Sequence, residues 1–90
     1  MNKERIRSKL LQLRPDLDIR TDQCEIVRVY AGKIVVGIDF RAMQGQFRAL
    51  ATRLDTETDF DSGAIEEVTA EDEPGIVEKV IALLDRYSPL

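Results

Sequence analysis

The sequence of 90 residues contains no histidine and no tryptophan, and its only cysteine is Cys24. Histidine is the commonest general base of enzymes and the commonest metal ligand, so its absence counts against both kinds of site. One cysteine forms no disulfide within the chain and cannot build a zinc site. We therefore expect no enzyme activity, no catalytic residue, no metal site and no cofactor, and we interpret Cys24 as a small buried hydrophobic residue.

Long apolar runs and phosphate-binding motifs are missing as well. No stretch approaches the roughly 18 apolar residues that a membrane-spanning helix needs, and the stretch MNKERIRSKLLQLRPD is too charged for a secretory signal. The glycine-rich phosphate-binding signatures and the G-x-S-x-G nucleophile motif do not occur. Together with the low cysteine content, these absences predict a cytoplasmic protein that does not contact a membrane.

Acidic and basic side chains are unevenly distributed along what we expect to be a single folded domain over residues 1–90. Residues 1–53 carry 11 basic and 6 acidic side chains, a net charge of +5, and residues 54–90 carry 2 basic and 11 acidic side chains, a net charge of −9. The two halves either neutralise each other, within the fold or across a dimer, or attract charged partners. A homodimer would also stabilise a chain this short.

The spacing of apolar residues predicts three helices. The first covers residues 3–13 and ends before Pro15. The second is expected over residues 41–54, with Gly45 in its interior and an apolar side formed by Met43, Phe47, Leu50 and Leu54. The third begins at Asp72, has Pro74 in its first turn, and carries an apolar stripe formed by Ile76, Val77, Val80, Ile81 and Leu84.

The stretch CEIVRVYAGKIVVGIDF predicts a β-hairpin. We expect a two-residue turn at Ala31-Gly32, with Tyr30 paired to Lys33. One face of the hairpin is then apolar and comprises Val27, Val29, Ile34, Val36, Ile38 and Phe40. The other face is mixed, and is either partly covered by the rest of the chain or an intermolecular interface. Its candidate anchors, for a partner or for a homodimer, are Ile26, Tyr30 and Val35.

Two further stretches fit short strands. DLDIRTD fits an edge strand or an extended lead-in, and residues 62–70 fit a strand or a helix. We favour a strand for residues 62–70, because a third strand would complete a sheet around the hairpin. The predicted fold is α+β, a small antiparallel sheet built on the hairpin with helices packed on one face, in the order α-β-β-α-β-α.

The stretch LDTETDFDSGAIEE concentrates negative charge between two predicted elements. A calcium loop that starts at Asp55 would have acids at positions 1, 3, 5 and 12, but Phe60 stands where the sharp turn needs glycine. The calcium interpretation is therefore weak. A solvated loop and a docking surface for a basic partner are the other interpretations. The candidate partner-binding residues are Asp55, Glu57, Asp59, Asp61, Glu66 and Glu67.

The sequence thus predicts a small, acidic, non-enzymatic protein-binding or regulatory accessory module, which docks a basic partner protein through the acidic segment, residues 55–73. One alternative is a nucleic-acid-binding accessory protein that uses basic side chains of the first two helices. These side chains are Lys3, Arg5, Arg7, Lys9, Arg14, Arg41 and Arg48. The negative net charge and the few aromatic residues count against this alternative. A homodimeric domain of unknown function is the other alternative.

Overall fold

A computed structural model describes residues 3–21, 27–41, 43–53 and 64–87 of the chain. Two helices and five strands are formed there. The helices are α1, Lys3–Leu13, and α3, Glu73–Tyr87. The strands are β1, Asp18–Thr21; β2, Val27–Ala31; β3, Ile34–Arg41; β4, Gln46–Arg53; and β5, Ala64–Ala70.

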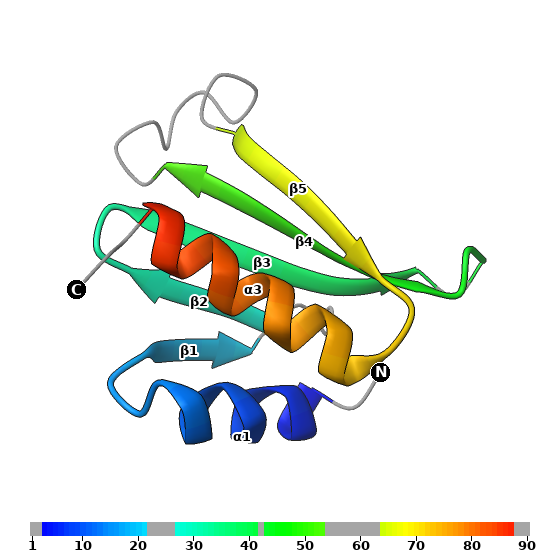
Figure 1. Cartoon of the computed structure of the whole chain (residues 1–90), viewed down its shortest axis with the longest axis horizontal. Coiled ribbons are helices and arrows are strands. Elements are labelled where there is room, and N and C mark those ends of the chain that lie inside the picture. Colours follow the sequence, from blue (N-terminus) through cyan, green and yellow to red (C-terminus); the bar gives the residue numbers. More distant parts are fainter. Residues whose placement is uncertain (1–2, 22–26, 42, 54–63, 88–90) are drawn as a thin grey trace.

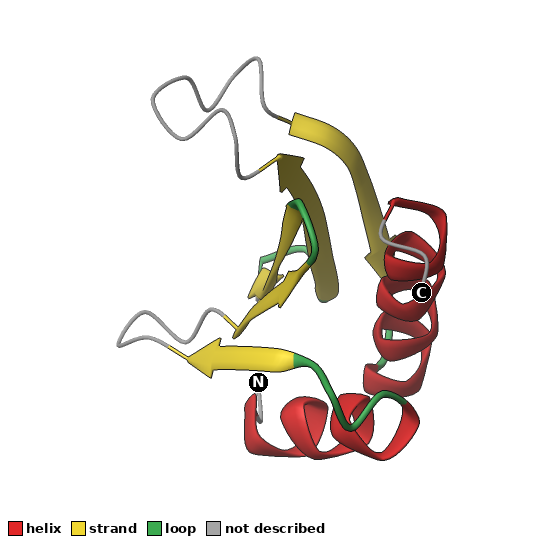
Figure 2. Cartoon of the chain, turned by 90° about the vertical axis from the view of Figure 1, so that its left-hand side faces the viewer, coloured by secondary structure: helices red, strands yellow, loops and turns green. Residues whose placement is uncertain are grey.

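The five strands form one antiparallel sheet in which every strand pairs with its neighbour along the chain, in the order β1-β2-β3-β4-β5 (Figure 1). Both helices lie on the same side of this sheet (Figure 2). The α+β class and the placement of helices on one face are therefore as predicted. No helix within the described ranges is long and apolar enough to cross a membrane.

The helix predicted over residues 41–54 is wrong, because residues 46–53 form the strand β4. Phe47, Ala49 and Ala51 alternate as buried residues on the helix-covered face, which is the period of a strand. Gly45 has φ of 63° and ends the turn between β3 and β4. This positive φ explains why glycine occurs at a position where a helix interior would not favour it. Met43, predicted to lie in the core, is fully exposed in this turn.

The hairpin of β2 and β3 is formed, but its register differs from the predicted one by two residues. Ala31 pairs with Ile34, so the turn is Gly32-Lys33, and Gly32 takes φ of 58°. Val29 consequently pairs with Val36 rather than with Ile34. A shift of two residues leaves each side chain on its predicted face, since side chains alternate with a period of two.

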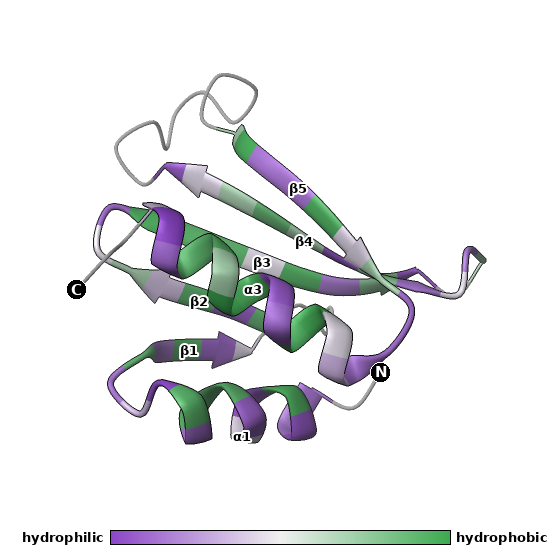
Figure 3. Cartoon of the chain, viewed as in Figure 1, coloured by the Kyte–Doolittle hydropathy of each residue, from purple (hydrophilic) through white to green (hydrophobic). Residues whose placement is uncertain are grey.

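The core lies between the sheet and the two helices (Figure 3). From the sheet it receives the predicted apolar hairpin face, except Phe40, which is 37% exposed and packs on Phe47 at 4.9 Å between ring centroids. The helices contribute Ile6, Leu10, Ile76, Val77, Val80, Leu83 and Leu84. The first and third predicted helices are therefore confirmed, with Leu13 of α1 on the outside.

The two ambiguous stretches are both strands. Asp18–Thr21 forms the short edge strand β1, and Ala64–Ala70 forms the opposite edge strand β5. A bulge between Ala51 and Thr52 interrupts the pairing of β4 with β5. The observed order of elements is thus helix, five strands, helix, instead of the predicted α-β-β-α-β-α.

Candidate functional site

The face of the sheet turned away from both helices, called here the open sheet face, is not covered by any helix of the described ranges (Figure 2). Side chains reach it from alternate positions of each strand, because neighbouring residues of a strand point to opposite faces. Its apolar residues Val35 and Leu50 are only half-buried. The open sheet face is therefore a candidate contact surface of the described strands.

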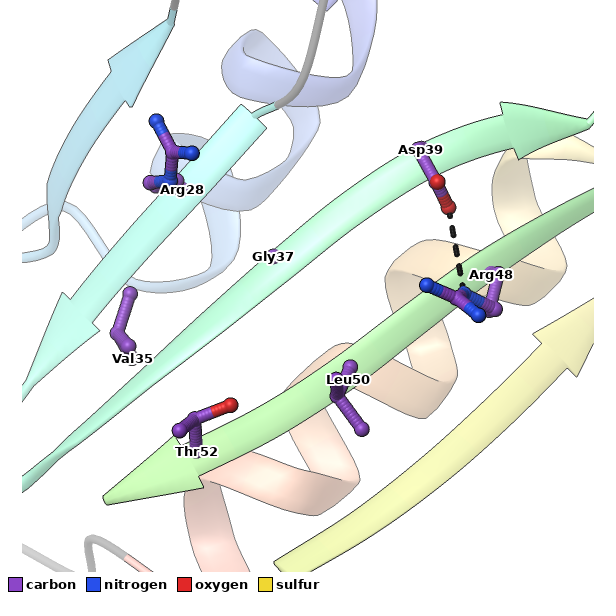
Figure 4. A pocket seen from close by; sticks show the side chains of 7 residues that line it. All are labelled: Arg28, Val35, Gly37, Asp39, Arg48, Leu50 and Thr52. Atoms are coloured by element: carbon purple, nitrogen blue, oxygen red, sulfur yellow. Dashed lines mark ion pairs between the residues drawn. The ribbon is translucent and has the colours of Figure 1, made fainter. Parts of the chain in front are cut away.

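A hollow occupies the middle of the open sheet face (Figure 4). Gly37 of the central strand β3 pairs with Arg28 on one side and with Leu50 on the other. Because Gly37 has no side chain, the neighbouring side chains surround a cavity of about 220 Å³, the Gly37 hollow. Its lining is Arg28, Val35, Gly37, Asp39, Arg48, Leu50 and Thr52. One part of the wall is apolar and the other is charged.

Most charged side chains on the open sheet face lie close to a side chain of opposite charge. Arg48 Nε lies 3.7 Å from Asp39 Oδ1, and Arg48 Nη1 lies 3.7 Å from Glu67 Oε2 (Figure 4 draws the pair with Asp39). At the β1 edge, Arg20 donates to both carboxylate oxygens of Asp18, and this hydrogen bonding and charge raise the pKa of Arg20. The face therefore has no strong excess of positive charge for tracking phosphates.

The Arg20 guanidinium also lies over an aromatic ring of the neighbouring strand. Its central carbon is 4.6 Å from the centroid of the Tyr30 ring, a cation–π contact. Tyr30 is one of the predicted anchors, and it pairs directly across the strands with Val35, the second anchor. Both are half-buried on the open sheet face. The third predicted anchor, Ile26, lies outside the described residues.

The predicted partner-binding acids fall into two groups. Asp55, Glu57, Asp59 and Asp61 lie outside the described residues. Glu66 and Glu67 are neighbours on β5 and point to opposite faces of the sheet, since Glu66 pairs with Ala51 and Glu67 with Leu50.

Glu66 binds the end of α3. Its Oε1 accepts a hydrogen bond of 2.6 Å from Arg86 Nη1 and one of 2.8 Å from the Tyr87 hydroxyl. The Tyr87 side chain, and after it the charge of Glu66, raise the pKa of Arg86. Glu66 is therefore already engaged within the fold, whereas Glu67 is exposed beside Arg48.

Two further acids of the segment stabilise the start of α3. Asp72 Oδ1 accepts a hydrogen bond of 2.8 Å from the backbone N–H of Gly75, which makes Asp72 the N-cap. Glu73 Oε2 lies 3.2 Å from Arg5 Nε of α1. The described acids of this region are thus used in part to hold the two helices in place.

Among the described residues, three ion pairs join the basic half of the chain to the acidic half, namely Arg5–Glu73, Arg14–Asp85 and Arg48–Glu67. The basic helix α1 lies beside β1 at one edge of the sheet, and β5 forms the opposite edge (Figure 1). The connection of residues 54–63, with four acids and no base, runs from Arg53 at the end of β4 to Ala64 at the start of β5. It is therefore attached at the edge far from α1.

The basic surface predicted for nucleic acid is not formed as expected. Arg41 and Arg48 belong to strands instead of a second helix, and Arg48 lies on the open sheet face, opposite to α1. On α1, Arg5 pairs with Glu73, and Arg14, just after the helix, pairs with Asp85 at 2.9 Å. The predicted cations therefore do not share one surface.

The described part of the chain contains no group of three or more cysteine or acidic side chains placed to hold a metal ion. Comparisons of the chain with protein-family models, with characterised proteins and with solved structures gave no match. The candidate sites therefore rest on geometry and charge alone. Sequence reasoning missed the contribution of Arg48, Leu50 and Thr52 to the Gly37 hollow, although the alternation of Phe47, Ala49 and Ala51 was a signal for a strand there.

Proposed function

We propose that this chain is a small, non-enzymatic protein-binding module that docks a basic partner protein through the acidic segment, residues 55–73. The observation that carries the proposal is the position of the acidic connection, which is attached beside β5, with the basic helix α1 at the far edge of the sheet. The two ends of this connection therefore lie far from α1, although Arg5 of α1 pairs with Glu73 of the same acidic segment. The charge of the connection then attracts a partner.

Electrostatic attraction of this kind acts mainly on the rate of association. Complementary charges steer two proteins together, and an exposed rim of charge contributes more to rate and selectivity than to affinity. We propose Asp55, Glu57, Asp59 and Asp61 as this rim, whereas Glu67 lies beside Arg48 on the open sheet face. Glu66 contributes less, because Arg86 and Tyr87 already bind its carboxylate. Screening at physiological salt limits the effect to a range of about 8 Å.

The test is capture from a lysate of the source cells at low salt, before and after nuclease treatment. We expect the wild-type chain to retain a basic protein that resists nuclease and elutes as salt rises. The variant D55N/E57Q/D59N removes three charges from the acidic segment and should lose this protein. The control variant E4Q/D16N/E78Q removes three exposed charges elsewhere and should retain it.

Equal capture by the two variants would contradict the proposal, because it would then make no difference whether the removed charges lie in the acidic segment or elsewhere. Capture of nucleic acid, with the proteins lost after nuclease, would favour the nucleic-acid alternative. If the wild-type chain captures no basic protein, that result would also contradict the docking of a basic partner.

A further inference from the structure

The open sheet face carries a row of side chains whose two halves complement each other. One row across β2 to β5 consists of Arg28 on β2, Gly37 on β3, Leu50 on β4 and Glu67 on β5, and it continues to Arg20 on the edge strand β1. A cation thus stands at one end of the row and an anion at the other, with an empty position beside an apolar side chain in the middle. We infer that this face packs against the same face of a second copy of the chain, about a two-fold axis that runs parallel to the strands between β3 and β4.

Such an axis places β3 of one copy over β4 of the other, and β2 over β5, while each row remains opposite the same row. Leu50 of each copy then enters the Gly37 hollow of the other, which fills an empty position with an apolar side chain. Arg28 of each copy lies opposite Glu67 of the other. Both contacts occur twice, as in any two-fold interface.

The neighbouring rows agree with the same axis. Asp39 and Arg48 share a row, so Asp39 of one copy lies opposite Arg48 of the other, and the pair already formed within each chain becomes a network of alternating charge. In the row on the other side of Gly37, Val35 lies opposite Thr52. In the same row, the large side chain of Tyr30 lies opposite the small side chain of Ala64 of the other copy, so the sizes are complementary there as well.

Three other two-fold axes bring like charges together. An axis across the strands along this row places Arg28 over Arg28 and Glu67 over Glu67. An axis along β3 places Asp39 over Asp39, and one along β4 places Arg48 over Arg48. Like charges that face each other across an interface repel one another and weaken binding. The axis between β3 and β4 avoids all of these contacts.

The area fits a weak, reversible dimer. The four strands that face each other, β2 to β5, lie about 4.8 Å apart and are about 23 Å long on average, which gives roughly 440 Å² per copy, or about 900 Å² over two copies. This area is just below the roughly 1,000 Å² of a stable specific interface and is typical of a transient one. We therefore expect a reversible dimer built as a sandwich of two sheets, whose facing strands are aligned with one another.

A charge exchange between Arg28 and Glu67 tests the arrangement. Within one chain these residues are three strands apart, about 14 Å, so they are too distant to pair directly. Arg28→Glu places Glu opposite Glu in the dimer, and Glu67→Arg places Arg opposite Arg. We expect each variant alone to raise the dimer dissociation constant at least about tenfold. An equimolar mixture of the two variants should form a heterodimer, because both of its pairs are again of opposite charge.

The measurement is sedimentation velocity from micromolar to millimolar concentration, with native mass spectrometry to identify the heterodimer. Arg7→Glu on the exposed side of α1 makes the same charge change and should leave the dimer unchanged. Circular dichroism checks that each variant is folded. If a variant is unfolded, Leu50→Asp is used in its place, because it puts a charge in the Gly37 hollow. A monomeric wild-type chain, an unchanged dimer in Arg28→Glu or Leu50→Asp, or a mixture that stays monomeric would overturn the inference.

Discussion

The Tyr87 hydroxyl donates a hydrogen bond of 2.8 Å to the Glu66 carboxylate and so joins the last residue of α3 to the edge strand β5. Arg86 Nη1 donates to the same oxygen at 2.6 Å. These bonds hold the C-terminal end of the helix over the strand that follows residues 54–63. An acid that the sequence suggests for partner binding therefore has a structural role.

Replacement of Tyr87 by Phe should destabilise the fold. Tyr87→Phe removes the half-buried hydroxyl and keeps the ring, so we expect the free energy of unfolding in urea to fall by about 1 kcal/mol. Tyr30→Phe is the matched control, since the ring stays under the Arg20 guanidinium and no described residue bonds its hydroxyl. That control should change stability by less than about 0.5 kcal/mol. Equal losses in the two variants would show that the bond to Glu66 contributes nothing.

The sign of the effect of Gly45→Ala distinguishes the observed turn from the predicted helix. Gly45 has φ of 63°, and an added Cβ would meet nothing within 4 Å, so only the backbone conformation opposes a side chain. In the turn, Gly45→Ala should lower the free energy of unfolding by about 1–2 kcal/mol. In a helix interior the same change would raise it by about 1 kcal/mol. Gly45→Asn should cost less than Gly45→Ala, because asparagine tolerates this region better. Thermal unfolding of the three chains decides.

The sequence predicted the helices at both ends and the faces of the hairpin, but it misread residues 46–53. Phe47 and Leu50 fit the spacing of a helix, and Ala49 and Ala51 are good helix formers. In the fold, Ala49 and Ala51 are fully buried against the helices, where position in the sheet overrides local preference. Local spacing alone could not separate these two interpretations.

The candidate sites were predicted in part. Tyr30 and Val35 lie together on one face as expected, because the alternation of the hairpin fixes its faces whatever the register. The Gly37 hollow was not predicted, because half of its wall comes from β4, the strand read as a helix. The ion pairs of Glu66 and Glu73 were also missed, since they join residues far apart in the sequence.

A conservative change in the core tests whether β3 packs as tightly as its burial indicates. Ile38 is fully buried on the helix-covered face. Ile38→Val removes one methylene and leaves a small cavity, so we expect a loss of about 1 kcal/mol in the free energy of unfolding. Leu13→Ala removes more atoms from a side chain that is 59% exposed, and should cost less. A larger loss in Leu13→Ala than in Ile38→Val would contradict this assignment of the core.

Substitutions of Asp72, the N-cap of α3, separate the contribution of its hydrogen bond from the contribution of its charge. Asp72 Oδ1 binds the Gly75 N–H, and a Cβ at position 75 would lie 2.7 Å from this oxygen, so glycine leaves room for the cap. Asp72→Ala should lower the free energy of unfolding by about 1 kcal/mol, whereas Asp72→Asn keeps an oxygen acceptor and should cost much less. Urea unfolding measures both. If Asp72→Asn costs as much as Asp72→Ala, the charge at the helix N-terminus is what stabilises α3, and the hydrogen bond is secondary.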